Sequence, residues 1–172
     1  MNILDTLKKT KENFDPRKDN INQPSGLPAG EYAVRLKSSN HEANPYTKRE
    51  EAKVVLEVIS GNHKNMLEFI NLNFDDDLPE FVIDKNAKIL LALAEYAVVE
   101  FTESELQSEQ TIAEALKRGI GKQFKMTLKL SPNKKNPDYP YRNYEFSEMK
   151  NEFTDDPFAQ NESEIGESDI PF

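Results

Sequence analysis

Apolar and polar residues alternate along five short stretches of the chain, the period-two pattern of half-buried β-strands. The alternation is clearest where Phe124, Met126 and Leu128 are separated by polar residues, and a similar pattern begins at Tyr32. The sequence therefore predicts five strands. They cover residues 32–37, 52–59, 66–74, 124–130 and 141–146, with a polar loop at 38–51.

A helical pattern interrupts this series between the third and fourth strands. Asp77 is placed as an N-cap, with Glu80 in the capping-box position and an apolar stripe over residues 83–94. A second, shorter helix is predicted over residues 111–119, where two cations followed by a glycine are typical of a helix C-terminus. The insert between the third and fourth strands is therefore helical.

Five short strands with a helical insert after the third predict a mainly-β fold, a five-stranded OB-fold barrel. Apolar residues on one side of residues 3–9 predict a short N-terminal helix. We expect residues 1–27 to form this helix and a connector, residues 28–148 the OB-fold domain, and residues 149–172 an acidic tail.

Charge is unevenly distributed along the chain. The net charge is −9, and seven carboxylates lie between Asn151 and Phe172 without a Lys or Arg, which predicts that this segment is disordered. Residues 117–142 carry eight basic residues against one acid, whereas residues 68–109 carry eleven acids against two lysines. The domain should therefore have a basic face and an acidic face, and the basic face suits a polyanion.

In an OB-fold, nucleic acid crosses the face of strands 2 and 3 between the loop joining strands 1 and 2 and the loop joining strands 4 and 5. Cationic side chains can neutralise phosphates there, and aromatic rings can stack on bases. Tyr32, Phe74 and Phe124 are assigned to the core. Phe69 is expected to project away from the core together with Asn71 and Asn73, and it fits either a stacked base or a homodimer contact. The candidate DNA-binding residues are Arg35, Lys37, Tyr46, Lys48, Arg49, Lys53, Phe69, Asn71, Lys122, Lys125, Lys129, Lys134, Lys135, Tyr139, Tyr141 and Arg142.

The sequence gives little support to an enzyme. It has no Cys, and His41 and His63 lack metal-ligand spacing, so neither a metal site nor a cofactor is expected. The run Asp75-Asp76-Asp77 is an alternative of another class, because clustered carboxylates could hold Mg²⁺ for phosphodiester cleavage. A structural role at a strand-to-helix turn is the preferred interpretation.

Asp169-Ile170-Pro171-Phe172 places an aromatic ring and a free α-carboxylate at the end of the acidic run. A partner could bind the ring in an apolar pocket and the carboxylate on a basic group. This ending resembles the tip of bacterial and phage single-stranded DNA-binding proteins, and residues 155–159 (DDPFA) resemble a second element of such tails. The resemblance implies recruitment of replication, recombination and repair proteins through Asp169, Ile170, Pro171 and Phe172.

The body is similar to a family of small phage proteins associated with single-stranded DNA binding. The similarity rests on residues 27–32 (LPAGEY), the Gly61 turn leading into 71–73 (NLN), the helix containing 90–94, and the basic strand that follows Gly121-Lys122. It implies sequence-nonspecific binding of single-stranded DNA during phage replication or recombination. A partner-recruiting OB-fold adaptor without DNA affinity is the alternative in function.

No apolar run reaches the length of a membrane span, and the first residues, MNILD, lack a signal-peptide hydrophobic stretch. We therefore expect no membrane partner and a cytoplasmic location, which for a phage protein is the cytoplasm of the bacterial host.

Overall fold

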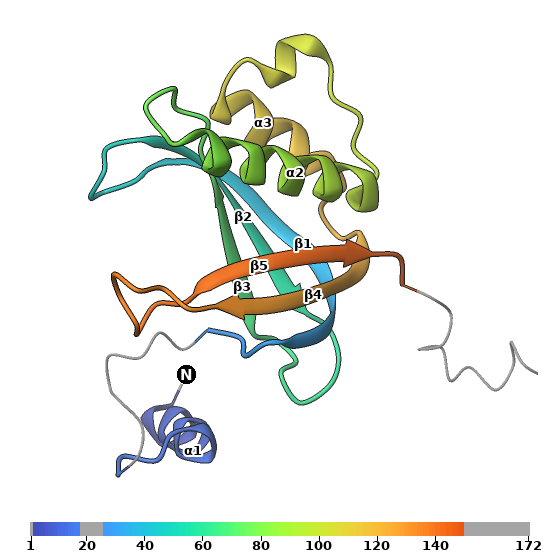
Figure 1. Cartoon of the computed structure of the whole chain (residues 1–172). Coiled ribbons are helices and arrows are strands. Elements are labelled where there is room, and N and C mark those ends of the chain that lie inside the picture. Colours follow the sequence, from blue (N-terminus) through green and yellow to red (C-terminus); the bar gives the residue numbers. More distant parts are fainter. Residues whose placement is uncertain (1, 18–25, 150–172) are drawn as a thin grey trace, which may run out of the picture.

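The structure is a computed structural model, and it describes residues 2–17 and 26–149. Five strands and three α-helices make up most of this part (Figure 1). In chain order the elements are α1 (Ile3–Asn13), β1 (Gly30–Ala43), β2 (Glu50–Val58), β3 (Leu67–Leu72), α2 (Glu80–Ala97), the 3₁₀ turn η1 (Glu103–Leu106), α3 (Glu109–Leu116), the 3₁₀ turn η2 (Lys117–Gly119), β4 (Gln123–Ser131) and β5 (Tyr141–Ser147).

The strands form one antiparallel sheet in the order β3-β2-β1-β4-β5. The mainly-β class, the five strands and the helical insert after the third strand confirm the sequence prediction. One face of the sheet is apolar because alternate residues of β1, β2 and β4 point to the same side. The buried side chains on this face include Val34, Leu36, Val54, Leu56, Phe124, Met126 and Leu128.

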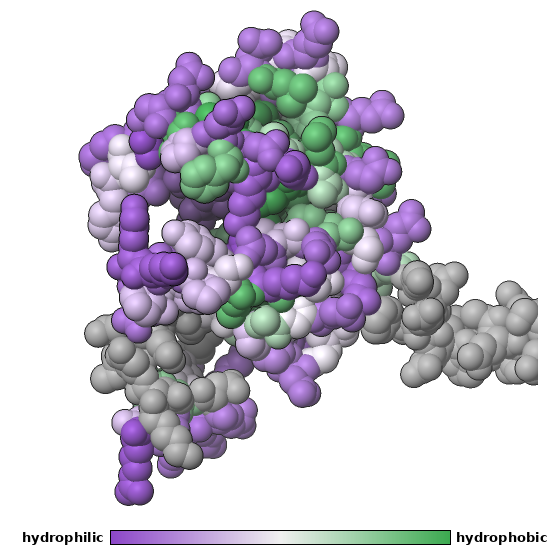
Figure 2. Space-filling view, viewed as in Figure 1, coloured by the Kyte–Doolittle hydropathy of each residue, from purple (hydrophilic) through white to green (hydrophobic). Residues whose placement is uncertain are grey.

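Helices α2 and α3 lie over one end of the sheet. α3 packs on β1 and β2, whereas α2 packs on β4 and β5 (Figure 1). Their buried faces contribute Leu93, Ala97 and Leu116 to the same core as the strands. The space-filling view shows apolar residues over this helical layer, where α2 also exposes Phe81 and Leu91 (Figure 2).

Side chains bridge the two edge strands of the sheet. Among the described strands no backbone ladder joins β3 to β5, so the sheet is open in its hydrogen bonding. Glu68 of β3 nevertheless accepts hydrogen bonds from Arg142 Nε at 2.5 Å and from Tyr144 Oη at 2.6 Å, both on β5. Arg142 Nη2 also donates to the Leu27 carbonyl at 2.8 Å, which ties the chain before β1 to the same point. We call Glu68, Arg142, Tyr144 and Leu27 the edge cluster.

β1 is longer than its sequence pattern indicates. It continues to Ala43, so that the predicted polar loop 38–51 shortens to residues 44–49. A bulge at Lys37 shifts the register, with Leu36 opposite Leu56 and Ser38 opposite Val55. Before the bulge the inward residues are even-numbered, from Tyr32 to Leu36, and after it the buried residue is Ser39. The apolar alternation that begins at Tyr32 therefore does not continue through the second half of the strand.

Two further predictions near β3 are wrong. α2 begins at Glu80 after Pro79, without a side-chain cap, and the Asp77 carboxylate binds Arg49 instead of capping the helix. Asn73 was expected to project with Phe69, but it lies beyond the end of β3 and is buried, where its Oδ1 accepts the Asp75 backbone N–H. The alternation that placed it outside ends with the strand.

α1 is longer than the predicted 3–9, and its N-cap is Asn2, whose Oδ1 accepts the Leu4 N–H. It exposes Ile3, Leu4 and Leu7. No helix in the described ranges is both long enough and apolar enough to span a membrane. The tail predicted over residues 149–172 lies outside the described residues, apart from Met149.

Candidate nucleic-acid interface

The outer face of β2 and β3 carries an exposed aromatic ring. Register places Lys53 opposite Asn71 and Val55 opposite Phe69. Because Ile70 and its alternate neighbours point into the core, Phe69 and Asn71 point outward, and Phe69 is 52% exposed. The Lys53 ammonium lies 5.4 Å from the centre of the Phe69 ring, within the range of a cation–π contact. We call Lys53, Val55, Phe69 and Asn71 the β2–β3 platform.

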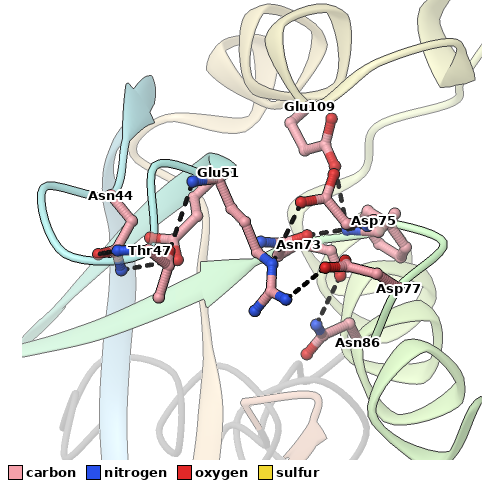
Figure 3. Close-up of polar contacts among 10 residues, drawn as sticks. Asn44, Thr47, Glu51, Asn73, Asp75, Asp77, Asn86 and Glu109 are labelled. Carbon is pink, nitrogen blue, oxygen red and sulfur yellow. Dashed lines mark hydrogen bonds and ion pairs between the residues drawn. The ribbon is translucent and has the colours of Figure 1, made fainter. Parts of the chain in front are cut away.

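The loop at residues 44–49 is held by its first residue. Asn44 Oδ1 accepts the backbone N–H groups of Tyr46 at 2.9 Å and Thr47 at 3.1 Å, and the Asn44 N–H donates to the Arg49 carbonyl at 2.8 Å (Figure 3). Lys48 takes a left-handed backbone conformation with φ of 62°, which turns the chain back toward β2. The loop therefore presents Tyr46, which is 92% exposed, on an ordered turn.

Arg49 closes this loop against the segment after β3. Its Nη2 lies 2.7 Å from Asp77 Oδ2, and its Nε lies 3.4 Å from Asp75 Oδ2 (Figure 3). The hydrogen bond that Arg49 donates to Asp77 raises the pKa of Arg49 above its usual range. Arg49 thus belongs to the candidate site by position, but both of these carboxylates already bind it.

The loop at residues 132–140 has a similar internal organiser. Asn133 Nδ2 donates to the Tyr139 carbonyl at 3.0 Å, and Asn133 Oδ1 accepts the N–H of Lys135 at 3.2 Å. Tyr139 and Tyr141 are about half exposed. Both loops extend to the same side of the sheet, on the left in Figure 1. Phe69 and the loop tyrosines are therefore the aromatic groups of the candidate interface.

The predicted cations fall into two groups. Lys48, Lys122, Lys134 and Lys135 form no ion pair with any described carboxylate. The others have partners: Lys53 pairs with Glu42, Lys125 with Glu31, Lys129 with Glu145, and both Arg35 and Lys37 with Glu57. The unpaired group offers its full charge to a ligand.

Glu57 shows how strongly some of these cations are held. Its carboxylate is buried and lies 2.6 Å from both Lys37 Nζ and Arg35 Nη2. The hydrogen bonds from Lys37 and then from Arg35 hold the pKa of Glu57 below its usual range. Sequence reasoning missed this carboxylate and Glu42, because the cation that each of them contacts lies on the neighbouring strand and is fixed by the strand pairing.

Position also divides the predicted residues. Lys125 and Lys129 lie on β4, which β1 separates from β2, so the structure does not bring them onto the β2–β3 platform. Arg142 turns to the inner side of the sheet and binds Glu68, whose side chain is only 4% exposed. We therefore place Arg142 in the edge cluster and leave it out of the candidate interface.

Asp75, Asp76 and Asp77 follow one another shortly after β3. Within residues 2–17 and 26–149, no group of three or more His, Cys, Asp or Glu side chains is arranged to hold a metal ion. Asp75 and Asp77 direct their carboxylates at Arg49, while Asp75 and Asp76 also line a pocket of about 380 Å³ with Phe74, Leu106 and Ile112. The cluster is therefore organised around an arginine.

Comparison with known proteins does not supply a function: no protein-family model matches the chain, and no curated protein is significantly similar to it.

Proposed function

We propose that this protein binds single-stranded DNA without sequence preference, on the β2–β3 platform between the 44–49 and 132–140 loops. The observation that carries the proposal is the exposed Phe69 ring beside Lys53. The flanking loops expose Tyr46 and Tyr139, and Tyr141 is exposed at the start of β5. The strand order β3-β2-β1-β4-β5, with side chains linking β3 to β5, supports an OB-fold barrel, a fold that binds oligonucleotides on this face.

The chemistry of the surface favours single strands. A base must leave its stack to lie on Phe69 or on a loop tyrosine, and each such stack contributes about 1–3 kcal/mol whatever the base. The unpaired Lys48, Lys134 and Lys135 would neutralise phosphates between the rings. Binding of this kind needs neither a metal nor a cofactor, and the proposal includes no catalytic step.

A fluorescent oligothymidine and a duplex of equal length, titrated over a range of salt concentrations, test the proposal. We expect the single strand to bind more tightly. The double variant Lys134→Glu/Lys135→Glu should bind less tightly and flatten the plot of log affinity against log salt by about 1.4, because each phosphate contact contributes about 0.7. Equal affinity for duplex and single strand would overturn the proposal.

The matched control reverses the same number of charges on the helical side of the molecule. Lys88 and Lys117 are exposed and pair with Asp84 and Glu114, far from the platform in sequence and on separate elements. Lys88→Glu/Lys117→Glu should change affinity through net charge alone. A loss as large as that of the loop variant would show that the 132–140 loop is not a specific part of the interface.

The same titration distinguishes the two alternatives. An adaptor that binds only proteins would leave both oligonucleotides free. A Mg²⁺-dependent nuclease would degrade the oligonucleotide when Mg²⁺ is added, and Asp75→Asn/Asp76→Asn would abolish the degradation. We expect stable complexes with or without Mg²⁺, because Asp75 is already bound to Arg49.

The second part of the proposal concerns residues 149–172 and rests on the sequence alone. We propose that Asp169, Ile170, Pro171 and Phe172 recruit DNA replication, recombination and repair proteins, since an acidic segment with an apolar aromatic end fits a basic-rimmed apolar pocket. Phe172→Ala should remove these enzymes from a pull-down with host lysate, while Phe153→Ala should not. Equal recovery with both variants would refute this part.

A further inference from the structure

Arg49 lies at the end of the β2–β3 platform, at the point where bound single-stranded DNA would run off the platform. It immediately precedes β2, and Asp75 and Asp77 follow β3, just beyond the last paired residues of the ladder, Ala52 and Leu72. The close-up shows the 44–49 loop and the segment after β3 approaching each other at this point (Figure 3). The ion pairs of Arg49 therefore border the surface on which we propose that DNA lies.

A carboxylate and a phosphate oxygen compete for the same groups of an arginine. The guanidinium presents five N–H donors that bind either anion through charge-assisted hydrogen bonds. Asp77 occupies Nη2 and Asp75 approaches Nε, so the protein supplies to Arg49 the kind of partner that a DNA backbone would supply. With two carboxylates on one guanidinium, the local charge is negative, and the site repels phosphate until a carboxylate leaves.

The pairing is also weak enough to exchange. The side chains of Arg49, Asp75 and Asp77 are 30%, 39% and 68% exposed, and the contact from Arg49 Nε to Asp75 is 3.4 Å long. Exposed ion pairs contribute at most about 1 kcal/mol, in contrast to pairs that are removed from water. A phosphate held nearby by Lys48 or Lys53 could therefore replace a carboxylate without disturbing the core.

We propose that Arg49 is a latent phosphate site, closed in the free protein by Asp75 and Asp77. The ligand it takes is a phosphodiester of the bound strand, so the inference rests on the proposed DNA binding and deepens it. Asp75 and Asp77 then determine whether Arg49 neutralises a phosphate. Arg49 adds its full charge to DNA binding only when a phosphate has displaced these carboxylates or when substitution has removed them.

The test compares two variants that remove the same charge from the same segment. Asp75→Asn/Asp77→Asn frees Arg49, whereas Asp76→Asn/Glu80→Gln removes two carboxylates that form no ion pair with any described residue. Relative to this control, the first variant should steepen the salt dependence of oligothymidine binding by about 0.7. If both converge at 1 M salt, that slope corresponds to about fivefold tighter binding at 0.1 M.

Arg49→Met completes the cycle. It should cost about fivefold more affinity in the Asp75→Asn/Asp77→Asn background than in the natural one, because only there is the guanidinium free. Thermal melting of every variant confirms that each is folded before its affinity is compared.

The outcomes separate the two proposals. If no form binds the oligonucleotide, the proposed function fails and the inference fails with it. If the natural protein binds and the two double variants behave alike, the proposed function stands and the latent site is refuted. If Asp75→Asn/Asp77→Asn binds more weakly than its control, the ion pairs position the 44–49 loop for binding, and the latent site is again refuted.

Discussion

Two arginines that look alike in the sequence have opposite surroundings in the fold. Arg142 and Arg49 each lie in or beside a loop expected to contact DNA. Arg142 binds one carboxylate, that of Glu68, through Nε and Nη2. Arg49 lies against two carboxylates, Asp75 at Nε and Asp77 at Nη2. Arg142 faces Glu68, whose side chain is 4% exposed, and it bridges the edge strands β3 and β5. Arg49 faces Asp75 and Asp77, which remain in contact with water.

The difference shows that the partner's access to water decides what an ion pair does. At the edge cluster, Glu68 accepts from Arg142 at 2.5 and 2.8 Å and from Tyr144 at 2.6 Å, so its buried charge is fully hydrogen-bonded. Removing a partner there leaves a charge that water cannot reach. At Arg49 a lost partner is replaced by water or by a ligand ion. The first pair is therefore structural, and the second is available for exchange.

The largest expected effect is that of Glu68→Ala. It leaves the Arg142 guanidinium without its anion at the edge of the core, and breaking a buried pair in this way costs about 3–5 kcal/mol. We expect the lower end, about 3 kcal/mol in the free energy of unfolding, because Arg142 is itself 27% exposed. Chemical denaturation measures the loss.

The matched control for this variant is Asp77→Ala at the other arginine. An exposed pair contributes about 0–1 kcal/mol, and Asp77 does not cap α2, so the free energy of unfolding should change by less than about 1 kcal/mol. Equal losses from Glu68→Ala and Asp77→Ala would break the comparison between the two arginines.

Tyr144→Phe should have the next largest effect. It removes the hydroxyl that donates to Glu68 and keeps the ring that stacks on Phe146, so it should cost about 1.5–3 kcal/mol, the range for a hydrogen bond to a charged group. Tyr141→Phe, on the exposed side of the same strand, should cost less than about 0.5 kcal/mol. Similar losses for the two would show that the hydroxyl of Tyr144 has no special role.

The titration of Tyr144 gives a second measurement on the same residue. Burial, together with the hydrogen bond to Glu68, raises the pKa of Tyr144 above its ordinary value of 10.0. A raised pKa in the folded state means that the contribution to stability is complete below pH 10 and is lost as the pH rises above it. The natural protein should therefore lose more stability above pH 10 than Tyr144→Phe does.

Sequence pattern was sufficient for the strands because alternation is a local property. The period-two pattern correctly predicted that Phe124, Met126 and Leu128 are buried and that Phe69 is exposed. The pattern failed where the result depends on a distant partner. The bulge at Lys37 hid the second half of β1, and the pairing of Arg142 with Glu68 joins residues 74 positions apart. Lists of basic residues cannot distinguish a cation bound inside the fold from a free one.

Phe69→Ala sharpens the comparison along a single strand, because Phe69 follows Glu68 and points to the opposite side. Loss of the ring should weaken single-strand binding by about 1–3 kcal/mol, the contribution of one stacked base. Its effect on unfolding should be under about 1 kcal/mol, since the ring is half exposed. Glu68→Ala should show the reverse order of effects, provided that the folded form is compared.

A control for Phe69 comes from another exposed ring. Phe81 on α2 is more exposed than Phe69 and does not belong to the β2–β3 platform. Phe81→Ala should leave oligothymidine affinity unchanged. If it weakens binding as much as Phe69→Ala, the aromatic contacts to DNA are not confined to the β2–β3 platform.

The smallest expected effect separates geometry from burial, using a third arginine. Arg118 binds Glu105 through both terminal nitrogens, at 2.5 and 3.0 Å, in a two-point contact like that of Arg142, yet it is exposed like Arg49. The hydrogen bond from Arg118, followed by one from the Thr102 backbone, lowers the pKa of Glu105 from 4.5 to about 2. A lowered pKa stabilises the fold above about pH 4.5, and this contribution is lost as the pH falls toward about 2.

Glu105→Gln should therefore flatten the decrease of melting temperature between these pH values. The melting temperature at pH 7 should change far less than in Glu68→Ala, because water screens the pair. If Glu105→Gln destabilises the protein at pH 7 as much as Glu68→Ala does, two-point geometry, and not removal from water, sets the strength of these arginine contacts.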